Sequence, residues 1–325
     1  FSVTSEDISS AIEMRGDAKA TALPGVVDVA LSQNSTSMLY SLEIAEGRAA
    51  GVPDVKMTLG GGKRDSATTL TGLRHTALLD LWAHLVAHHA PEDFTTGQSA
   101  LKARIAAAMP LFQAVTYRAT GADFAFESPF GIAKAAKAGI DLDLAGMIRD
   151  GRFGLAVAVS GFQAYSLFMP KWGQKLVPTD LALAGRVTGY DVATPTSLFL
   201  DGADFTAKKP LTDDQEARIA AAFLPTGAAE IVLDGNRLTG PLYDLTLDGR
   251  MTAGPKGAKG AVTVRARGVE KVAEHLAGFP DDEQAKSIAG VVAVARTFAE
   301  RKGDDLVWRF DFDGDHVSVN GKPLK

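Results

Sequence analysis

The chain has 325 residues, 46% of them hydrophobic, which is enough to build the core of one large domain or two smaller ones. Its formal net charge is -5, with acidic and basic residues interspersed, so it lacks the basic stripe that binds nucleic acid or acidic membranes. It contains no Cys, which excludes disulfides, Cys-ligated metals and thiol nucleophiles. A chain free of Cys suits an oxidising compartment, and we expect a periplasmic protein.

The most apolar stretches, 153–162 and 288–295, have the length of a strand or a short helix rather than of a membrane span. The sequence begins at Phe1 rather than at Met, which indicates a processed or truncated start. We therefore expect membrane association only through an N-terminal anchor that precedes this sequence, in an inner-membrane-anchored form of the protein.

Apolar and polar residues alternate with period two in many segments, as in strands with one buried face. In the clearest example, Leu306, Trp308 and Phe310 alternate with Arg309 and Asp311. Similar segments occur near residues 27–31, 40–44, 55–59, 140–144, 155–159, 243–248 and 262–267. Turn residues at 234–236 and 313–315 predict hairpins, so we expect an antiparallel sheet.

Helical periodicity is confined to a few segments. One stripe contains Leu78, Leu81, Trp82 and Leu85, and a second follows Thr95-x-x-Gln98, which has the pattern of a capping box. Residues 269–276 and 288–299 repeat this arrangement around Pro280, and a single shorter helix is predicted after Thr212-x-x-Gln215. The predicted fold is α+β: a long curved antiparallel sheet with two helical hairpins packed on one face.

Three segments follow from this pattern: a β-rich half with a helical hairpin (1–138), a middle β segment with one helix (139–226) and a second β-rich half with a helical hairpin (227–325). They are compatible with one continuous domain. Gly51 and Gly240, and likewise Pro91 and Pro280, occupy matching positions in the two halves. This spacing predicts an internal duplication in which 40–126 and 229–313 superpose with the same strand order; chance similarity in an Ala- and Gly-rich chain is the alternative.

Few residues suggest chemistry. His84 and His88 have the spacing of two metal ligands on a helix, but no third ligand is evident, and Leu85 stands where a metalloprotease motif would have its Glu. The segment from Asp311 resembles the start of a calcium loop without the required Gly and Glu. We therefore expect no metal site, no cofactor and no catalytic residues, and a protein that is not an enzyme.

The C-terminal run from Leu306 to Leu324, with the preceding Leu238-Thr239-Gly240-Pro241-Leu242, resembles proteobacterial envelope proteins of the YdgA-like and AsmA-like type, in an alphaproteobacterial branch. The resemblance covers 175–325 best. It implies a periplasm-facing protein, often anchored at its N-terminus, with a long curved sheet whose apolar inner face carries acyl chains. It transfers no functional residues, since these families have no motif with an assigned chemical role.

These observations predict a periplasmic protein that binds lipid or another apolar small molecule and acts in envelope maintenance. Many strands with one apolar face, and few helices to cover them, predict an elongated groove between the sheet and the helical hairpins. We expect six residues to line this groove: Trp82, Leu85, Phe112, Leu276, Val292 and Phe298. The alternative is a non-enzymatic interaction scaffold with a closed core.

Overall fold

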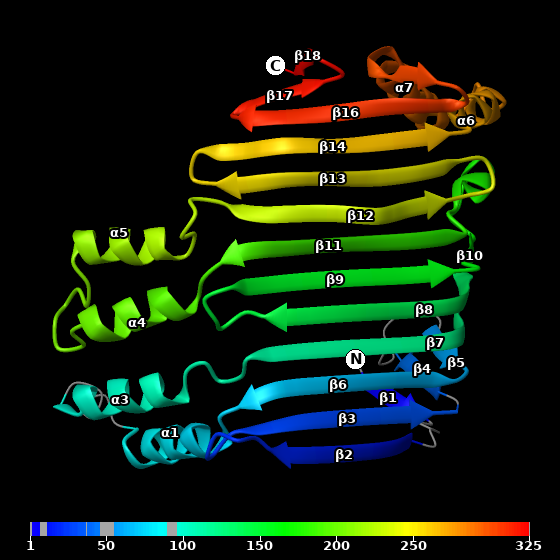
Figure 1. Ribbon diagram of the computed structural model, residues 1–325. Coiled ribbons are helices and arrows are strands. Elements are labelled where there is room, and N and C mark those ends of the chain that lie inside the picture. The colour runs from blue at the N-terminus through cyan, green and yellow to red at the C-terminus, as the bar shows by residue number, and fades with distance from the viewer. Residues whose placement is uncertain (1, 7–11, 37, 46–54, 90–95, 325) are drawn as a thin grey trace.

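The fold is a single layer of antiparallel strands, seen in a computed structural model that describes residues 2–6, 12–36, 38–45, 55–89 and 96–324. Within these residues all 18 strands belong to one sheet. Figure 1 shows the strands of its main part following one another across the molecule in chain order. In this order they are β2 (Ile12–Ala20), β3 (Val27–Ser35), β6 (Arg64–Leu73), β7 (Ala114–Ser128), β8 (Gly131–Ala145), β9 (Gly151–Ser160), β11 (Asp180–Tyr190), β12 (Ala229–Thr239), β13 (Asp244–Gly254), β14 (Gly257–Arg267), β16 (Asp305–Gly314), β17 (His316–Val319) and β18 (Lys322–Leu324).

Five shorter strands extend this sheet locally. β7 pairs with β6 up to Gly121 and with β5 (Val55–Gly61) from Ala125, and a positive φ of 56° at Asp123 lies between the two parts. β5 in turn pairs with β4 (Met38–Ala45), and β4 with β1 (Ser2–Glu6). β10 (Gln163–Ser166) pairs with β8, and β15 (Glu300–Lys302) pairs with β16. The predicted antiparallel sheet is thus confirmed.

Six α-helices are described, in three pairs: α1 (His75–Ala87) with α3 (Gln98–Ala108), α4 (Ala193–Gly202) with α5 (Asp213–Ala222), and α6 (Val269–Ala277) with α7 (Glu283–Phe298); a 3-10 helix, η1, spans Gly173–Leu176. Each pair connects two neighbouring antiparallel strands, β6 to β7, β11 to β12, and β14 to β16. A helical pair therefore takes the place of a hairpin turn three times.

Each of the three strands that precede a helical pair ends at or next to a glycine with positive φ: Gly72, Gly189 and Gly268. At Gly268 a Cβ would lie 2.1 Å from the carbonyl oxygen of Leu242, so a side chain is excluded by space as well as by backbone conformation. These glycines let the chain leave the sheet abruptly and enter a helix.

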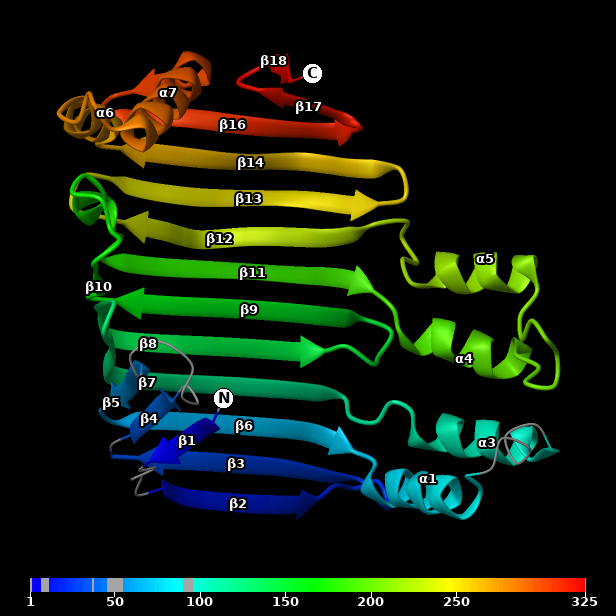
Figure 2. The ribbon, with the colours of Figure 1, turned by 180° about the vertical axis from the view of Figure 1, so that it is seen from behind.

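The helical pairs lie in different places relative to the sheet. Figures 1 and 2 show α1, α3, α4 and α5 beyond the ends of the strands, beside the sheet, while α6 and α7 lie at the opposite strand ends, in front of the sheet in Figure 2. The prediction that two helical hairpins pack on one face is therefore wrong for the first hairpin. None of the residues of α1 is buried, because the connection from β6 carries the helix past the sheet rather than over it.

Two details of the helices differ from the prediction. The capping box of Thr212 and Gln215 is confirmed at the start of α5, but α4 was not predicted, so the middle segment has two α-helices rather than one. The second predicted capping residue, Thr95, lies outside the described residues, and α3 has Gly97 at its N-cap with no side-chain cap hydrogen bond.

The predicted duplication does not hold as stated. In the C-terminal half β13 pairs with β12 and β14, whereas in the N-terminal half β5 pairs with β4 and β7, and β6 pairs with β3. The strand order of 40–126 thus differs from that of 229–313. The hairpin of β4 and β5 is inserted in the chain between β3 and β6, which remain neighbours in the sheet. Gly51 and Pro91, two of the residues that suggested the repeat, lie outside the described residues.

The predicted hairpin at 313–315 is confirmed between β16 and β17, but the one at 234–236 is wrong. These residues form a bulge inside β12, with Gly235 at a φ of 70°. The buried Asn236 side chain fills the gap in the ladder: its Oδ1 accepts from Ala184 N (2.7 Å) and its Nδ2 donates to Ala184 O (3.0 Å).

A cluster of buried hydrophobic residues lies where η1 meets α6 and α7. Trp172, Leu276 and Ala285 are buried together there. The indole of Trp172 donates to Asp282 (3.0 Å), which also accepts from two backbone N–H groups as the N-cap of α7. None of the described helices has the length and apolarity needed to cross a membrane.

Candidate functional site

The two faces of the sheet differ sharply in character. Residues directly opposite in an antiparallel pair lie on the same face, so the register assigns each residue to a face. One row across the middle of the sheet contains Ile140, Val157 and Leu183. Three neighbouring rows on this face, each crossing β8, β9 and β11, contain Ala138, Val159 and Leu181; Leu142, Leu155 and Gly185; and Leu144, Phe153 and Val187.

This face, called the apolar face below, continues into the C-terminal strands. Leu238 on β12 faces Leu245 on β13, and the row continues through Ala266 and Leu306 on β14 and β16. A parallel row joins Leu247, Val264 and Trp308. Asn236 also occupies a position on this face, where its amide is used by the backbone of Ala184.

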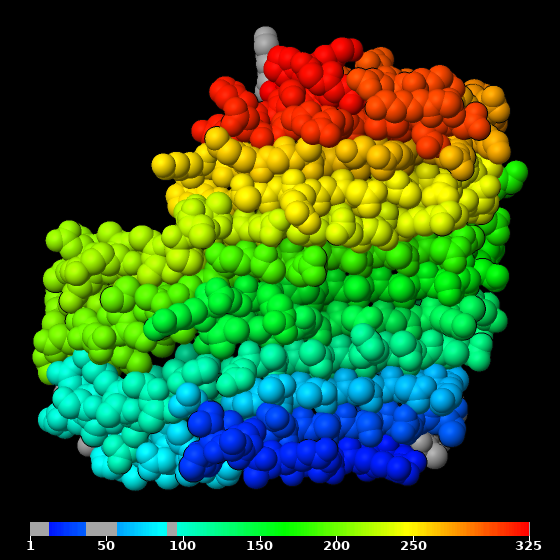
Figure 3. All heavy atoms as spheres, viewed as in Figure 1, coloured from blue at the N-terminus to red at the C-terminus, as the bar shows by residue number. Residues whose placement is uncertain are grey.

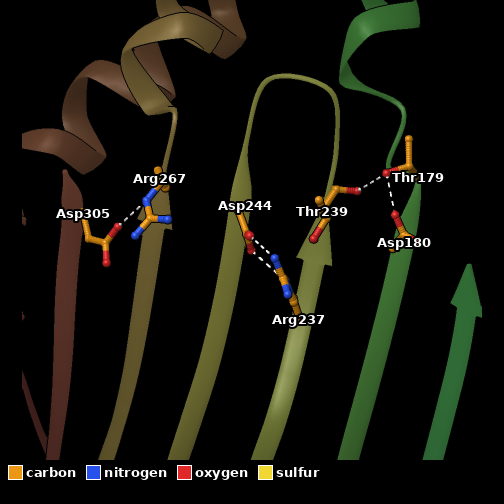
Figure 4. A network of polar contacts seen from close by, with 7 residues as sticks. All are labelled: Thr179, Asp180, Arg237, Thr239, Asp244, Arg267 and Asp305. Atoms are coloured by element: carbon orange, nitrogen blue, oxygen red, sulfur yellow. Dashed lines mark hydrogen bonds and ion pairs between the residues drawn. The ribbon is translucent and has the colours of Figure 1, made fainter.

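The opposite face has charged side chains that pair across neighbouring strands. Arg118 pairs with Asp141, Arg152 with Asp143 (2.9 Å), Arg250 with Glu230 (3.3 Å), Arg265 with Asp248 (3.5 Å), and Lys259 with Asp313 (3.3 Å). Figure 4 shows two more pairs near the strand ends, Arg237 with Asp244 and Arg267 with Asp305, beside the hydrogen bonds of Thr179 to Asp180 and Thr239. Figure 3 shows the molecule in space-filling form from this side, as a broad surface on which the strands follow one another.

The basic and acidic side chains of the charged face neutralise one another in pairs. The hydrogen bond and charge of Asp141 raise the pKa of Arg118, and those of Asp143 raise the pKa of Arg152. Exposed pairs of this kind contribute little stability but satisfy one another. This face therefore carries alternating charge rather than a patch of one sign.

The middle of the apolar face is open to solvent. Ile140 is 37% exposed, Leu155 38% and Leu183 50%, although they occupy adjoining strands and would be core residues in a two-layered protein. In Figures 1 and 2 none of the described helices crosses this part of the sheet. Monomeric proteins seldom expose contiguous apolar surface of this extent without a use for it.

At the C-terminal end of the same face, α7 lies over the sheet and forms one wall of an open apolar pocket. Trp308 Nε1 on β16 donates to the carbonyl of Ala295 on α7 (2.8 Å), and Asn320 Nδ2 donates to the carbonyl of Phe298 (2.7 Å), which fixes the helix to the sheet. The pocket has a volume of about 450 Å³. Its lining is made of hydrophobic side chains only: Leu245, Val264, Ala266, Val269, Val292, Ala295, Phe298, Trp308, Phe310, Val319 and Leu324.

The six residues expected to line a groove lie in three places. Val292 and Phe298 line the pocket beneath α7. Leu276 is buried in the cluster of Trp172 and Ala285 and does not line the pocket beneath α7. Trp82 and Leu85 lie on α1, with Trp82 66% exposed, and Phe112 follows α3, so the structure does not bring these three residues to the pocket.

The His residues that suggested a metal site lie on or next to α1. The rings of His84 and His88 have centroids 4.3 Å apart, and His88 Nδ1 lies 3.0 Å from the carbonyl of His84. Within the described part of the chain, no three His, Asp or Glu side chains come together as metal ligands would.

The residues that the sequence reasoning missed are those of β8, β9 and β11 on the apolar face, above all Leu155 and Leu183. Alternation predicts strands at 140–144 and 155–159, within β8 and β9, but no strand was predicted at β11, which contains Leu183. The signal that they stay uncovered is the sequence of α4 and α5, which offers no long apolar stripe to lay over these strands.

In comparisons with known proteins, no family model, curated protein or solved structure matches this chain.

Proposed function

We propose that this protein binds lipid, or another apolar molecule with an alkyl chain, along the apolar face of its sheet. One observation carries the proposal: Ile140, Leu155 and Leu183, on neighbouring strands of one face, are all more than a third exposed. The pocket beneath α7 continues this face at its C-terminal end. Open face and pocket together offer a path for an extended chain.

The energetics favour an apolar ligand over a charged one. Burial of an alkyl chain contributes about 0.8 kcal/mol per CH₂, so partial coverage of the face holds a lipid without a charged anchor. The curvature predicted for the sheet belongs to this proposal, because a concave apolar face encloses more of a chain than a flat one does.

The cellular setting is part of the same proposal. The absence of Cys and the resemblance to YdgA-like and AsmA-like envelope proteins support a periplasmic protein in envelope maintenance, with an N-terminal anchor as its only means of membrane association. Within this proposal the protein is not an enzyme. It presents an apolar surface on which a molecule is held, and its ion-paired face stays in water.

The proposal is tested by placing one carboxylate on either face of the same strand. Leu183→Glu puts a charge in the middle of the apolar face, and Ala182→Glu puts the same charge on the opposite face one residue away. With a fluorescent fatty acid as the probe, we expect Leu183→Glu to weaken binding at least about tenfold and Ala182→Glu to leave it near wild type.

Circular dichroism checks that both variants remain folded. Equal affinities of the two folded variants, or no binding of the probe to the wild-type protein, would contradict the proposal. In the second case the alternative, a non-enzymatic interaction scaffold that holds no apolar ligand, becomes the better explanation.

A further inference from the structure

The N-terminal strand of the main sheet, β2, has a free edge among the described residues. It pairs with β3 on one side, and no described strand pairs with its other side. Figure 2 shows β2 as the outermost strand. Residues 13–20 are all exposed, and Met14 is 71% exposed.

This edge differs from the opposite edge of the sheet in length and regularity. β17 has 4 residues and β18 has 3, with Pro323 in the middle of β18, and such short, Pro-containing strands discourage further pairing. β2 has 9 residues, contains no Pro, and runs in unbroken register against β3. It is a regular template for one more strand.

The side chains of β2 follow the two faces of the sheet. Gly16 and Ala18 are opposite Leu31 and Val29 of β3, on the same side as Met14. The other side has Glu13, Arg15, Asp17 and Lys19, whose charges alternate in sign along the strand. Arg15 pairs with Glu13 (2.6 Å) and Lys19 with Asp17 (3.7 Å) within the strand.

We propose that a second copy of this chain pairs with β2, antiparallel, about a twofold axis at Gly16. In this register Glu13 lies opposite the partner's Lys19, and Arg15 lies opposite the partner's Asp17. The twofold axis repeats both pairs, so every charge on the strand meets its opposite across the interface. Met14 lies opposite the partner's Ala18 on the other side, which keeps apolar residues next to apolar residues.

The charge pattern selects this register over its neighbours. A shift of two residues in one direction places Glu13 opposite Asp17 and Arg15 opposite Arg15. The same shift in the other direction places Arg15 opposite Lys19 and Asp17 opposite Asp17. A shift of one residue puts the charged side chains on the apolar face. Like charges directly opposite are destabilising, so the register centred on Gly16 is the one that the sequence favours.

Such a dimer joins two sheets edge to edge into one continuous sheet. The two apolar faces then lie on the same side, and the two charged faces on the other, because directly opposite residues share a face. The interface is isologous and closes on itself, so it produces a dimer rather than a fibre. The inference does not depend on any bound ligand.

The test exchanges charges within each ion pair of the strand, which preserves the composition, the net charge and the pairing within the strand. Variant one carries Glu13→Arg and Arg15→Glu, and variant two carries Asp17→Lys and Lys19→Asp. Alone, each variant places like charges opposite one another in the dimer, and we expect its dimer dissociation constant, measured by sedimentation velocity, to rise at least roughly tenfold above that of the wild type. When the two variants are mixed, every cross-strand pair again joins opposite charges, and we expect a heterodimer of wild-type affinity.

The full chain is used throughout, free of lipid, so the result is separate from the proposed lipid binding. A wild-type protein that stays monomeric at every accessible concentration would show that the charges protect a free edge, and would overturn the inference. So would a dimer whose affinity is unchanged in either variant alone, or variants that fail to associate with one another although each is folded.

Discussion

The C-terminal third of the sheet and its middle have the same alternating sequence pattern but different surroundings. At the C-terminal end, Ala266 and Leu306 face each other beside α6 and α7 and are buried. In the middle, Leu155 and Leu183 occupy equivalent positions on the apolar face and are exposed. The difference lies in the helical pairs: α6 and α7 are placed against the sheet, whereas α4 and α5 continue outward beyond the strand ends (Figure 1). Alternation therefore identifies the apolar face of a strand, and a neighbouring element decides whether that face becomes core.

The largest expected effect compares two leucines, one from each environment. Leu276→Ala removes a side chain that is 2% exposed in the cluster of Trp172, and we expect the free energy of unfolding to fall by about 2–5 kcal/mol. Leu183→Ala, at an exposed position, should cost less than about 1 kcal/mol. Urea denaturation of both variants gives the comparison directly. Equal losses would mean that the apolar face is closed in solution.

A smaller effect is expected at the bulge between the two regions. Asn236→Ala leaves the N–H and C=O of Ala184 without their partner, which should lower stability by about 1–3 kcal/mol. Asn34→Ala, at an exposed position on β3, serves as the matched control and should have little effect. If the two variants lose the same stability in urea, the amide of Asn236 does not hold β11 and β12 together.

A pH-dependent effect is expected at the N-cap of α7, in the covered region. The hydrogen bond from the backbone of Ala285, with those from Trp172 and Gln284, lowers the pKa of Asp282 below its ordinary value. A lowered pKa in the folded state stabilises the protein above the unfolded pKa, near 4, and this stabilisation is lost as the pH falls through the folded value. We expect Asp282→Ala to lower the melting temperature at pH 7 by less than Leu276→Ala and Asn236→Ala do, and the difference from wild type to shrink in acid.

The pH experiment has its own control in Asp282→Asn, which keeps an acceptor for the helix N-terminus without the ionisable group. Its melting temperature should follow pH less steeply than that of the wild type over the acid range. If the melting temperature of Asp282→Ala lies below that of the wild type by the same amount at neutral and at acid pH, the helix does not hold the carboxylate in its charged form.

The smallest effect is expected on the charged face. Arg250→Gln breaks the exposed pair with Glu230, and we expect a change of about 0–1 kcal/mol in the free energy of unfolding, smaller still at high salt. The measurement is urea denaturation at low and high ionic strength. A loss above this range would mean that the ion pairs of this face, rather than its backbone hydrogen bonds, hold the strands together.

Much of the local structure could be predicted from the sequence, and the reasons are local. Alternation located strands such as β13, β14 and β16, and the pair Thr212 and Gln215 located the start of α5, because a capping box involves only neighbouring residues. Helix α4 was missed because Pro195 and its Thr and Ser neighbours have weak helix propensity, although Pro is tolerated in a first turn.

The placement of the helices and the role of Asn236 could not be predicted, since both depend on distant parts of the chain. A stripe that includes Trp82 shows that α1 has an apolar side but not which surface it meets, and in the structure this side is largely exposed. Asn236 sits in a sequence typical of a turn, and only its contact with Ala184, 52 residues away, makes it part of a bulge. Apolar surface on one side of a sheet was therefore predicted from the sequence, and of the six residues expected to line a groove, Val292 and Phe298 lie at the pocket beneath α7.

The central claim is that the open apolar face holds an apolar molecule, and the most direct test is to recover that molecule. The protein is purified from its native cells without detergent and extracted with organic solvent, and the extract is analysed by mass spectrometry against an equal amount of Leu183→Glu protein. We expect a near-stoichiometric lipid or other alkyl compound from the wild type and a strongly reduced amount from the variant. Recovery of no apolar compound from folded wild-type protein, or of equal amounts from both proteins, would contradict the account.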